Sequence, residues 1–304
     1  MNNFEVIGVD LGNRTVEAVS QWTYDNPIVF DSKTTKIKPL MTKCHEIEID
    51  NKKYYVGEGK LDTEYRKVDK KNYITMLYTA ISLATKSPNV KLVLGLPIGQ
   101  IQEDASELIN LVMSNSNKTV KINGNQMTIN IQDIEVMPEG VCTKEDTYNG
   151  IIIDIGAGTT DCAIMSTVRG CRKIKKPISI PRGINTFYQE VADRLNEEYT
   201  RIGLDLDMED VEEILDNGFF EYEGDKYKVD SYSLYTEFAE DIIGKLRAAK
   251  YPLKNKLVSI TGGGSIAPYQ AFRDIIGKNC ELQDDPLIAN ARNYYEIGVN
   301  LFMR

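Results

Sequence analysis

One stretch of the chain carries residue types that suit phosphate chemistry. Residues 151–153 are three isoleucines, which predict a buried strand, and Asp154 stands at the end of this strand. The small residues Gly156–Thr160 follow before a second apolar run, so the stretch predicts a β-hairpin. Glycine lets a backbone approach a ligand closely, and successive N–H groups in a turn can bind an anion. A carboxylate beside such a turn suits Mg²⁺ and a phosphate chain; an ordinary glycine-rich hairpin is the alternative.

The N-terminal region repeats this design. An apolar strand over residues 6–9 ends in Asp10, a turn with Gly12, Asn13 and Arg14 follows, and a second apolar strand returns over residues 15–19. A third glycine-rich segment, Ser259–Ser265, follows another apolar strand near the C-terminus. Two strand–Asp–turn–strand units suggest two similar halves that face one phosphate chain.

These three segments resemble, in order and separation, the two phosphate hairpins and the adenosine motif of the actin superfamily of ATPases. The resemblance implies an α/β fold of the actin-like (ribonuclease H-like) two-domain type with the nucleotide in the interdomain cleft. The implied first domain spans residues 1–149, with the C-terminal helix 287–304 returning to it, and the second domain spans residues 150–286.

The same resemblance implies a ligand and its contact residues. ATP or ADP is expected with Mg²⁺, and GTP stays open as an alternative nucleotide. Asp10 and Asp154 are expected to act on the metal mainly through water. The expected nucleotide contacts are Asp10, Gly12, Asn13, Arg14, Gly156, Gly158, Thr159, Thr160, Gly262, Gly263 and Gly264. Gly183, which precedes a helix expected over 186–200, is a weaker candidate; Thr186 and Gln189 have the spacing of a capping box there.

Pro138-Glu139 lies between the two hairpin motifs and supplies the candidate for catalysis. The Gly-Leu-Pro passage at residues 95–97 resembles a feature of plasmid-segregation actins of the ParM type. In those proteins a Pro-Glu at the place of Pro138-Glu139 leads a connecting helix. The glutamate there is thought to orient the attacking water, so Glu139 and Asp154 are the expected catalytic residues. The simpler alternative is a glutamate favoured by a helix dipole. Gly140 and the residues after it are weak helix formers, which predicts an irregular connection.

Composition limits the classes of protein that the chain can represent. It has 304 residues, of which 42% are hydrophobic and 27% charged, so a packed globular protein is expected. A net charge of −9 argues against direct nucleic-acid binding. The chain shows neither a signal peptide nor a membrane-spanning run, and its five scattered cysteines fit a reducing cytoplasm. His45 is the only histidine, which excludes a multi-histidine metal site.

Hydrophobic periodicity predicts the remaining elements. Hairpins are expected to turn near residues 50–51, 123–125 and 224–225, and separate strands are expected over 90–96 and 134–137. The basic run Arg169–Lys176 is expected at a solvated hairpin tip, with contact to an acidic partner or a neighbouring subunit as the alternative. Helices are expected over residues 69–86, 103–115, 186–200, 208–215, 231–250 and 286–302.

Three functions fit the resemblance. The favoured one is a polymerising bacterial ATPase whose dynamic filaments segregate plasmid DNA, with the protein itself and a DNA-binding adaptor at a plasmid centromere as partners. A small-molecule, sugar-type kinase of the same superfamily is the alternative. A non-hydrolysing nucleotide-binding scaffold is disfavoured because Asp10, Glu139 and Asp154 keep acidic residues at the expected catalytic positions.

Overall fold

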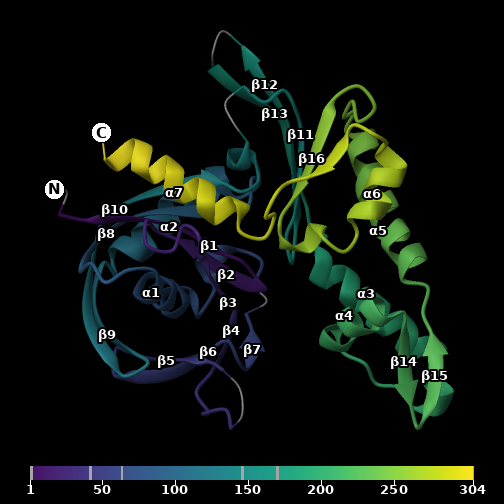
Figure 1. The fold of residues 1–304 in the computed structure, drawn as a ribbon, viewed down its shortest axis with the longest axis horizontal. Coiled ribbons are helices and arrows are strands. Elements are labelled where there is room, and N and C mark those ends of the chain that lie inside the picture. Colours follow the sequence, from purple (N-terminus) through teal and green to yellow (C-terminus); the bar gives the residue numbers. More distant parts are fainter. Residues whose placement is uncertain (1–2, 41–42, 63, 145–146, 169–170, 304) are drawn as a thin grey trace. The chain divides into compact units, whose positions relative to one another are not determined.

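The computed structural model describes residues 3–40, 43–62, 64–144, 147–168 and 171–303 (Figure 1). The chain divides into two compact units, each with its own sheet and its own hydrophobic core. Unit 1 consists of Met1–Glu145 and Leu287–Arg304, and unit 2 consists of Asp146–Pro286.

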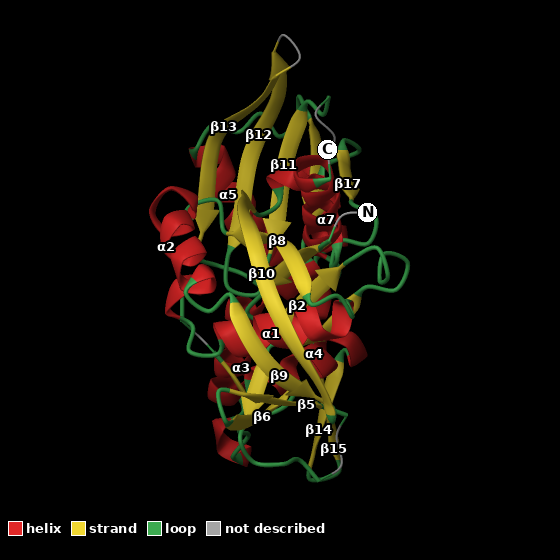
Figure 2. Cartoon of the chain, turned by 90° about the vertical axis from the view of Figure 1, so that its left-hand side faces the viewer, coloured by secondary structure: helices red, strands yellow, loops and turns green. Residues whose placement is uncertain are grey.

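Unit 1 is built on one large mixed sheet, which curls around a central helix (Figures 1 and 2). In sheet order its strands are β3 (Ile28–Asp31), β2 (Thr15–Val19), β1 (Glu5–Leu11), β8 (Asn89–Leu96), β10 (Asn125–Pro138), β9 (Asn117–Ile122), β5 (His45–Ile49), β6 (Lys52–Val56), β4 (Lys33–Thr35) and β7 (Lys60–Leu61). Among the described residues, its helical segments are η1 (Lys67–Asp69), α1 (Tyr73–Ala84), α2 (Ile101–Met113), η2 (Val141–Thr143) and α7 (Ala289–Phe302).

Strand β1 is buried along its whole length because helices cover both of its faces. Ile7 and Val9 point to one face and belong to the core that α1 completes. Gly8 points to the other face, where α7 crosses so closely that a Cβ on this glycine would lie 2.3 Å from the carbonyl oxygen of Ala291. The C-terminal helix is therefore packed directly on the strand that ends in Asp10.

Unit 2 has a smaller five-stranded sheet. Its strands, in sheet order, are β13 (Cys171–Ile180), β12 (Thr160–Val168), β11 (Gly150–Ile155), β16 (Leu257–Thr261) and β17 (Cys280–Leu282). Ile151, Ile153 and Ile155 of β11 pack into a core with aromatic and aliphatic residues of the helices. Within the described chain, the other elements are α3 (Ile184–Glu198), η3 (Thr200–Ile202), α4 (Met208–Asn217), the hairpin of β14 (Phe219–Tyr222) and β15 (Asp225–Lys228), α5 (Ser231–Ala248), η4 (Gly263–Ser265) and α6 (Tyr269–Ile276).

The two sheets share an ordered set of five strands. β3-β2-β1-β8-β10 in unit 1 matches β13-β12-β11-β16-β17 in unit 2. In both sets the first two pairings are antiparallel and the last two are parallel. The similarity of two halves, which the sequence shows only in the hairpin motifs, therefore extends to the topology of both sheets.

The hairpins predicted near residues 50–51, 123–125 and 224–225 all form close to where the turn residues indicate. Asp50 and Asn51 adopt positive φ between β5 and β6, and Asn123 and Gly124 do so between β9 and β10. The separate strand predicted over 134–137 is wrong, because β10 runs unbroken from Asn125 to Pro138, with one register shift next to Gln132. In the basic run Arg169–Lys176, residues 169 and 170 lie outside the described residues, and the side chains of Lys173 and Lys175 are exposed on β13.

The start of α3 also differs from the prediction. The helix begins at Ile184 with Gly183 as its N-cap, and no side chain caps it, so the predicted capping box of Thr186 and Gln189 is wrong. The first backbone N–H groups are satisfied instead by the preceding hairpin, as described below. In the parts of the chain that the structure covers, no helix has both the length and the apolar character that a membrane crossing needs.

Candidate functional site

The first candidate hairpin joins β1 to β2 in unit 1. Asp10 lies at the end of β1, is 9% exposed, and is paired in the ladder with Glu17 of β2. Gly12, Asn13 and Arg14 form the turn. A Cβ on Gly12 would lie 2.6 Å from the carbonyl oxygen of Thr15, so this glycine is required because the turn folds back on itself.

Lys67 lies at the centre of a buried charge cluster beside this hairpin. Its Nζ is 3.1 Å from Oδ1 of Asp10 and 2.5 Å from Oε1 of Glu139, although the residue is only 5% exposed. Burial acts to lower the pKa of Lys67, but the charges of Asp10 and Glu139 outweigh it and raise this pKa. The lysine is therefore a fixed cation that holds the two predicted carboxylates of unit 1 together.

The C-terminal helix ties the same cluster to the chain after β10. Nδ2 of Asn290 donates to Oδ2 of Asp10 over 3.1 Å, and Oδ1 of Asn290 accepts from the backbone N–H of Gly140 over 3.0 Å. At Gly140 the backbone makes a γ-turn, with φ 74° and a hydrogen bond from the Val141 N–H to the Glu139 carbonyl. The predicted irregular connection after Glu139 is thus confirmed, and a 3₁₀ turn follows where the resemblance implies a helix.

The segment that carries Lys67 is fastened to α2 and to the Gly-Leu-Pro passage. Nη2 of Arg66 lies 2.7 Å from Oδ1 of Asp104, whose side chain is almost completely buried. Gln100 donates to the carbonyl of Tyr65 over 3.0 Å. The carbonyl of Leu96 in turn accepts from the backbone N–H of Glu139 over 2.9 Å. The passage at residues 95–100 therefore positions both Lys67 and Glu139.

Glu17 is a further buried carboxyl group of this cluster. Burial, followed by the neighbouring charge of Asp10, raises its pKa well above the usual range. Ionisation of both of two adjacent buried carboxyl groups costs free energy, because their negative charges repel each other away from water. Lys67 and Asn290 contact Asp10 directly, whereas burial and the charge of Asp10 favour the protonated form of Glu17.

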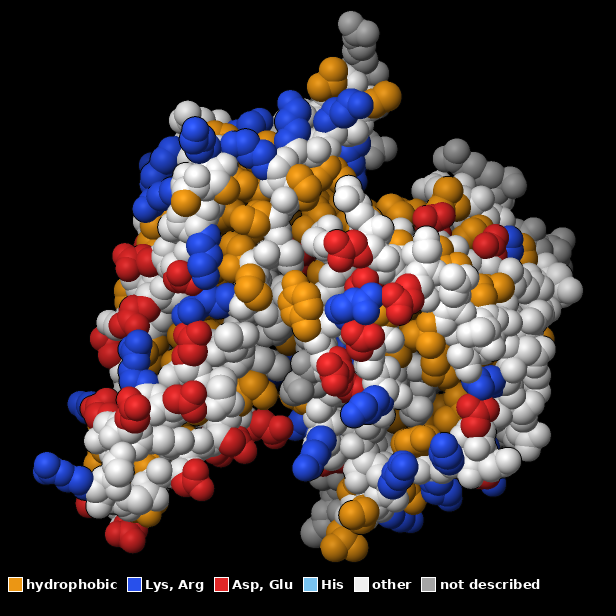
Figure 3. Space-filling model, turned by 180° about the vertical axis from the view of Figure 1, so that it is seen from behind, with side chains coloured by type: hydrophobic (Ala, Val, Ile, Leu, Met, Phe, Trp, Pro, Cys, Tyr) orange, Lys and Arg blue, Asp and Glu red, His pale blue; other side chains and the backbone are white. Residues whose placement is uncertain are grey.

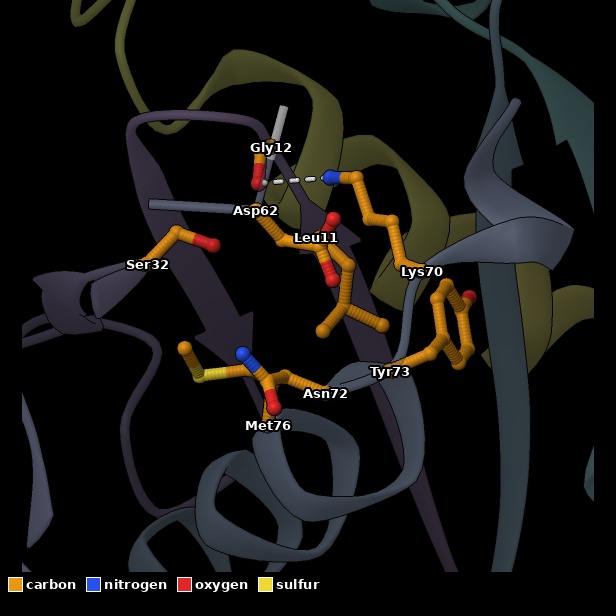
Figure 4. Close-up of a pocket in the computed structure, with 8 residues that line it drawn as sticks. All are labelled: Leu11, Gly12, Ser32, Asp62, Lys70, Asn72, Tyr73 and Met76. Atoms are coloured by element: carbon orange, nitrogen blue, oxygen red, sulfur yellow. Dashed lines mark hydrogen bonds between the residues drawn. The ribbon is translucent and has the colours of Figure 1, made fainter. Parts of the chain in front are cut away.

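Lys70, one turn beyond Lys67, contacts the hairpin turn itself. Its Nζ donates to the carbonyl of Gly12 over 3.2 Å, beside a small cavity of about 10 Å³ that Asp62 also lines (Figure 4). Burial first, and then the charge of Lys67, lower the pKa of Lys70 to about 7. Two lysines of one segment thus contact the first hairpin, but only Lys67 is a permanent cation.

The second candidate hairpin joins β11 to β12 in unit 2. Asp154 is 5% exposed and is paired with Asp161 in the ladder, as Asp10 is with Glu17. The turn spans Gly156–Thr159 and closes with a hydrogen bond from the Gly156 N–H to the Thr159 carbonyl. The Thr159 hydroxyl donates to Asp161 over 3.0 Å. Thr160 is fully buried and donates to the carbonyl of Arg182, so its hydroxyl anchors the hairpin to the segment before α3.

The predicted glycines of unit 2 gather around this hairpin. The backbone N–H groups of Ile184 and Asn185, at the start of α3, donate to the carbonyls of Gly156 and Ala157. A Cβ on Gly183 would lie 2.4 Å from the Ala157 carbonyl. On the other side, a Cβ on Gly262, whose φ is 87°, would lie 2.2 Å from Oδ1 of Asp154. The Gly262–Gly264 loop therefore reaches Asp154 only because it lacks side chains there.

Few acidic side chains in the described part of each unit are placed where they could hold a metal ion. Among the described residues, no group of three or more His, Cys, Asp or Glu side chains is placed to hold a metal ion. Within each unit, one strand-terminal aspartate carries the predicted metal role. This donor set fits Mg²⁺, which binds proteins through one or two carboxylates and keeps several waters.

Comparison with known proteins agrees with this architecture. Residues 8–141 match the family model described as the actin-like proteins' N-terminal domain. No curated protein sequence matches the chain. A ParM protein from a filament of Clostridium botulinum is 20% identical over 99% of this chain and 100% of its own length, with a TM-score of 0.83.

The chain has the actin-like fold. An archaeal actin homologue, Ta0583, solved in complex with ADP, is 17% identical over 98% of this chain and 100% of its own length, with a TM-score of 0.79. The Alp12 filament protein is 18% identical over 98% of this chain and 99% of its own length, with a TM-score of 0.68. The predicted resemblance to actin-like proteins is confirmed at the level of the fold.

Four residues of this actin-like chain complete the first hairpin site without appearing among the predicted site residues. Lys67 and Lys70 lie in a segment that has no recognisable motif, Glu17 is one polar residue within a strand pattern, and Asn290 is far away in the sequence. The only signal was the concentration of basic residues at positions 66–71 before α1, which resembles an ordinary solvated loop.

Lys70 makes the stability of the actin-like unit 1 depend on pH. Its pKa is 10.5 in an unfolded chain and about 7 in the folded one, so between these values only the unfolded chain holds the proton. Lowering the pH from about 10 to about 7 should destabilise the wild type, by up to about 1.4 kcal/mol per pH unit. Lys67 adds nothing in this window because it is protonated in both states.

Urea unfolding of wild type and Lys70→Met across this pH range tests the effect, with the exposed Lys71→Met as control. As the pH falls, the free energy of unfolding should decrease more for the wild type than for Lys70→Met. The control should show the same decrease as the wild type. Parallel curves for wild type and Lys70→Met would contradict the assignment.

Proposed function

We propose that this protein is a polymerising ATPase that binds ATP and ADP with Mg²⁺ and assembles into dynamic filaments for the segregation of plasmid DNA. ATP is the proposed nucleotide, with GTP as the alternative. The protein itself is the first partner, and a DNA-binding adaptor on a plasmid centromere is the second. The proposed location is the bacterial cytoplasm.

The paired hairpins carry the nucleotide proposal. Each unit has a buried aspartate at the end of a central strand, a tight turn after it, and a second acidic residue opposite it in the ladder. Two such hairpins can hold the phosphates of one nucleotide through backbone N–H groups and water-bound metal. The ADP complex of Ta0583, a protein of the same fold, supports this assignment.

The proposed chemistry uses the charge cluster of unit 1. Hydrolysis of a terminal phosphate needs a positioned water and stabilisation of the developing negative charge. Glu139, held at 2.5 Å by Lys67, is the proposed acceptor of a proton or hydrogen bond from that water. Lys67 is a positioning residue, because its ammonium group holds the Glu139 carboxyl group in place.

Both carboxylate oxygens of Asp10 already accept from nitrogen donors, Lys67 on one side and Asn290 on the other. This arrangement favours the proposed role of Asp10 through metal-bound water rather than by direct coordination. A bound Mg²⁺ would neutralise charge on the phosphate oxygens. The proposed holders of its water shell are Asp10 and Asp154.

Filament formation is supported by the ParM and Alp12 relatives, which were solved as filaments, and by the charge distribution of unit 2. Exposed basic residues gather at one end: Lys173, Lys175, Lys176, Arg247, Lys250 and Lys254. Exposed acidic residues surround α4 at the other end: Asp205, Asp207, Glu209, Asp210, Glu213 and Asp216. Figure 3 shows blue side chains at the upper end of this unit and red ones below. Opposite charge at opposite ends favours head-to-tail association, which extends into a filament unless it closes.

The catalytic proposal predicts that Glu139→Gln slows hydrolysis while preserving assembly. ATP turnover should fall by about 10²-fold or more, in the range of general-base contributions, whereas ATP binding stays nearly unchanged. The variant should pellet with ATP and disassemble slowly. Phosphate release and high-speed sedimentation with ATP and with ADP measure both effects.

Glu135→Gln is the matched control, because Glu135 lies on the same strand with an exposed side chain. It should behave as wild type. Unchanged turnover in a folded Glu139→Gln variant would remove Glu139 from the mechanism. If neither wild type nor variant sediments with any nucleotide, and a sugar is phosphorylated instead, the filament proposal fails in favour of the kinase.

The charge distribution predicts that two double variants sediment poorly alone and well when they are mixed. Lys175→Glu combined with Arg247→Glu reverses two of the charges at the basic end of unit 2, and Glu209→Lys combined with Glu213→Lys reverses two of the charges at the acidic end. Each double variant alone should sediment less than wild type with ATP, and an equimolar mixture should recover sedimentation through alternating contacts. Lys52→Glu with Lys121→Glu, on exposed strands of unit 1, is the control. A mixture that sediments no better than its components would exclude this contact.

A further inference from the structure

A groove in unit 1 is separate from the charge cluster around Lys67. It lies between the start of β1, the turn after β2 and the loop that follows α1, over residues 3–5, 21–23 and 83–88. Its volume of about 660 Å³ is within the range of sites that hold a peptide side chain or a small ligand. We refer to it below as the Trp22 groove.

A buried carboxyl group lines the Trp22 groove. Glu5 is 5% exposed, and its Oε2 accepts a hydrogen bond from the hydroxyl of Thr85. Its other oxygen, Oε1, is also buried and has no hydrogen-bond partner within the described chain. An unpaired buried oxygen is costly, so this position is suited to a donor that arrives with a ligand.

The rim of the groove carries the only tryptophan of the protein. Trp22 is 73% exposed, which is unusual for a large aromatic side chain. Its turn is nevertheless ordered by hydrogen bonds: the Trp22 N–H donates to the hydroxyl of Ser20, and that hydroxyl donates to the carbonyl of Ala84. Ser20 itself is fully buried. The indole is thus presented to solvent on a fixed turn, which lowers the entropy cost of binding through it.

Phe4, Leu83 and Pro88 add apolar surface to the same groove. Lys86 also lines it, but its side chain is exposed and its long stem lets the ammonium group turn into water. A ligand that matches these features has a cation for the Glu5 oxygen and an apolar or planar part for the indole. A guanidinium group satisfies both requirements, since it pairs with carboxylates and stacks on aromatic faces.

We propose that the Trp22 groove is a docking site for a partner protein, and that it receives an arginine flanked by apolar residues. The guanidinium donates to Oε1 of Glu5, and the neighbouring apolar side chains pack on Trp22 and Phe4. Tryptophan and arginine are the residue types that dominate binding energy at protein interfaces. The site is independent of the proposed nucleotide chemistry, and its test requires no ATP.

The sole tryptophan makes the test direct, because tryptophan emission, excited selectively at a wavelength that tyrosine does not absorb, reports only on this groove. The full-length protein is titrated with acetyl-Ala-Leu-Arg-Leu-Ala-amide and with the same peptide carrying neutral citrulline in place of arginine. The arginine peptide should change the emission saturably, and the citrulline peptide should bind at least about tenfold more weakly. Glu5→Gln should reduce affinity for the arginine peptide by a similar factor and leave the citrulline peptide unaffected.

If Glu5→Gln fails to fold, Trp22→Ala provides an independent test, with binding measured by calorimetry. Trp22 is exposed, so its removal leaves the core intact. This variant should lose most of the affinity for the arginine peptide. Glu48→Gln, on the exposed side of β5, is the control and should bind as wild type does. The proposal is overturned by equal affinity for both peptides, by unchanged binding to Trp22→Ala, or by the absence of a saturable signal up to about 10 mM peptide.

Discussion

Unit 1 depends on the ion pairs that the buried ammonium group of Lys67 forms with two carboxyl groups. A charge in this position is tolerated only when it is paired and hydrogen-bonded, and Asp10 and Glu139 supply the partners. This requirement brings together the end of β1, the end of β10 and the segment before α1. Asn290 extends the same network to α7, so the C-terminal helix contributes to the site as well as to the core.

Unit 2 holds its own hairpin by a different means. Where unit 1 uses a lysine and an asparagine, unit 2 brings backbone close to Asp154 through Gly262 and secures the turn with N–H groups of α3. The two halves thus share strand order, the strand-terminal aspartate and the acidic residue opposite it, but not the surrounding side chains. A common scaffold with different surroundings is consistent with the different roles proposed for Asp10, Glu139 and Asp154.

Local signals predicted many of the elements, but not all of their boundaries and not their assembly. The β-branched run before Asp154 and the turn residues Asp50-Asn51 and Asn123-Gly124 act over a few positions, and the structure confirms the strands and turns that they predict. The start of α3 was misplaced because its N–H groups bond to carbonyls of the preceding hairpin, a tertiary effect that no capping pattern encodes. Lys67 and Asn290 meet Asp10 across long sequence separations, so only the fold reveals them.

We propose that the two hairpins, one from each unit, hold one nucleotide with its metal. Isothermal titration calorimetry of the full-length protein with ATP in Mg²⁺ tests it most directly. We expect one nucleotide per chain, with binding weakened by at least about tenfold when Asp154 is changed to Ala in a variant that still folds. No measurable heat with ATP, ADP, GTP or GDP at about millimolar concentration would exclude this nucleotide site.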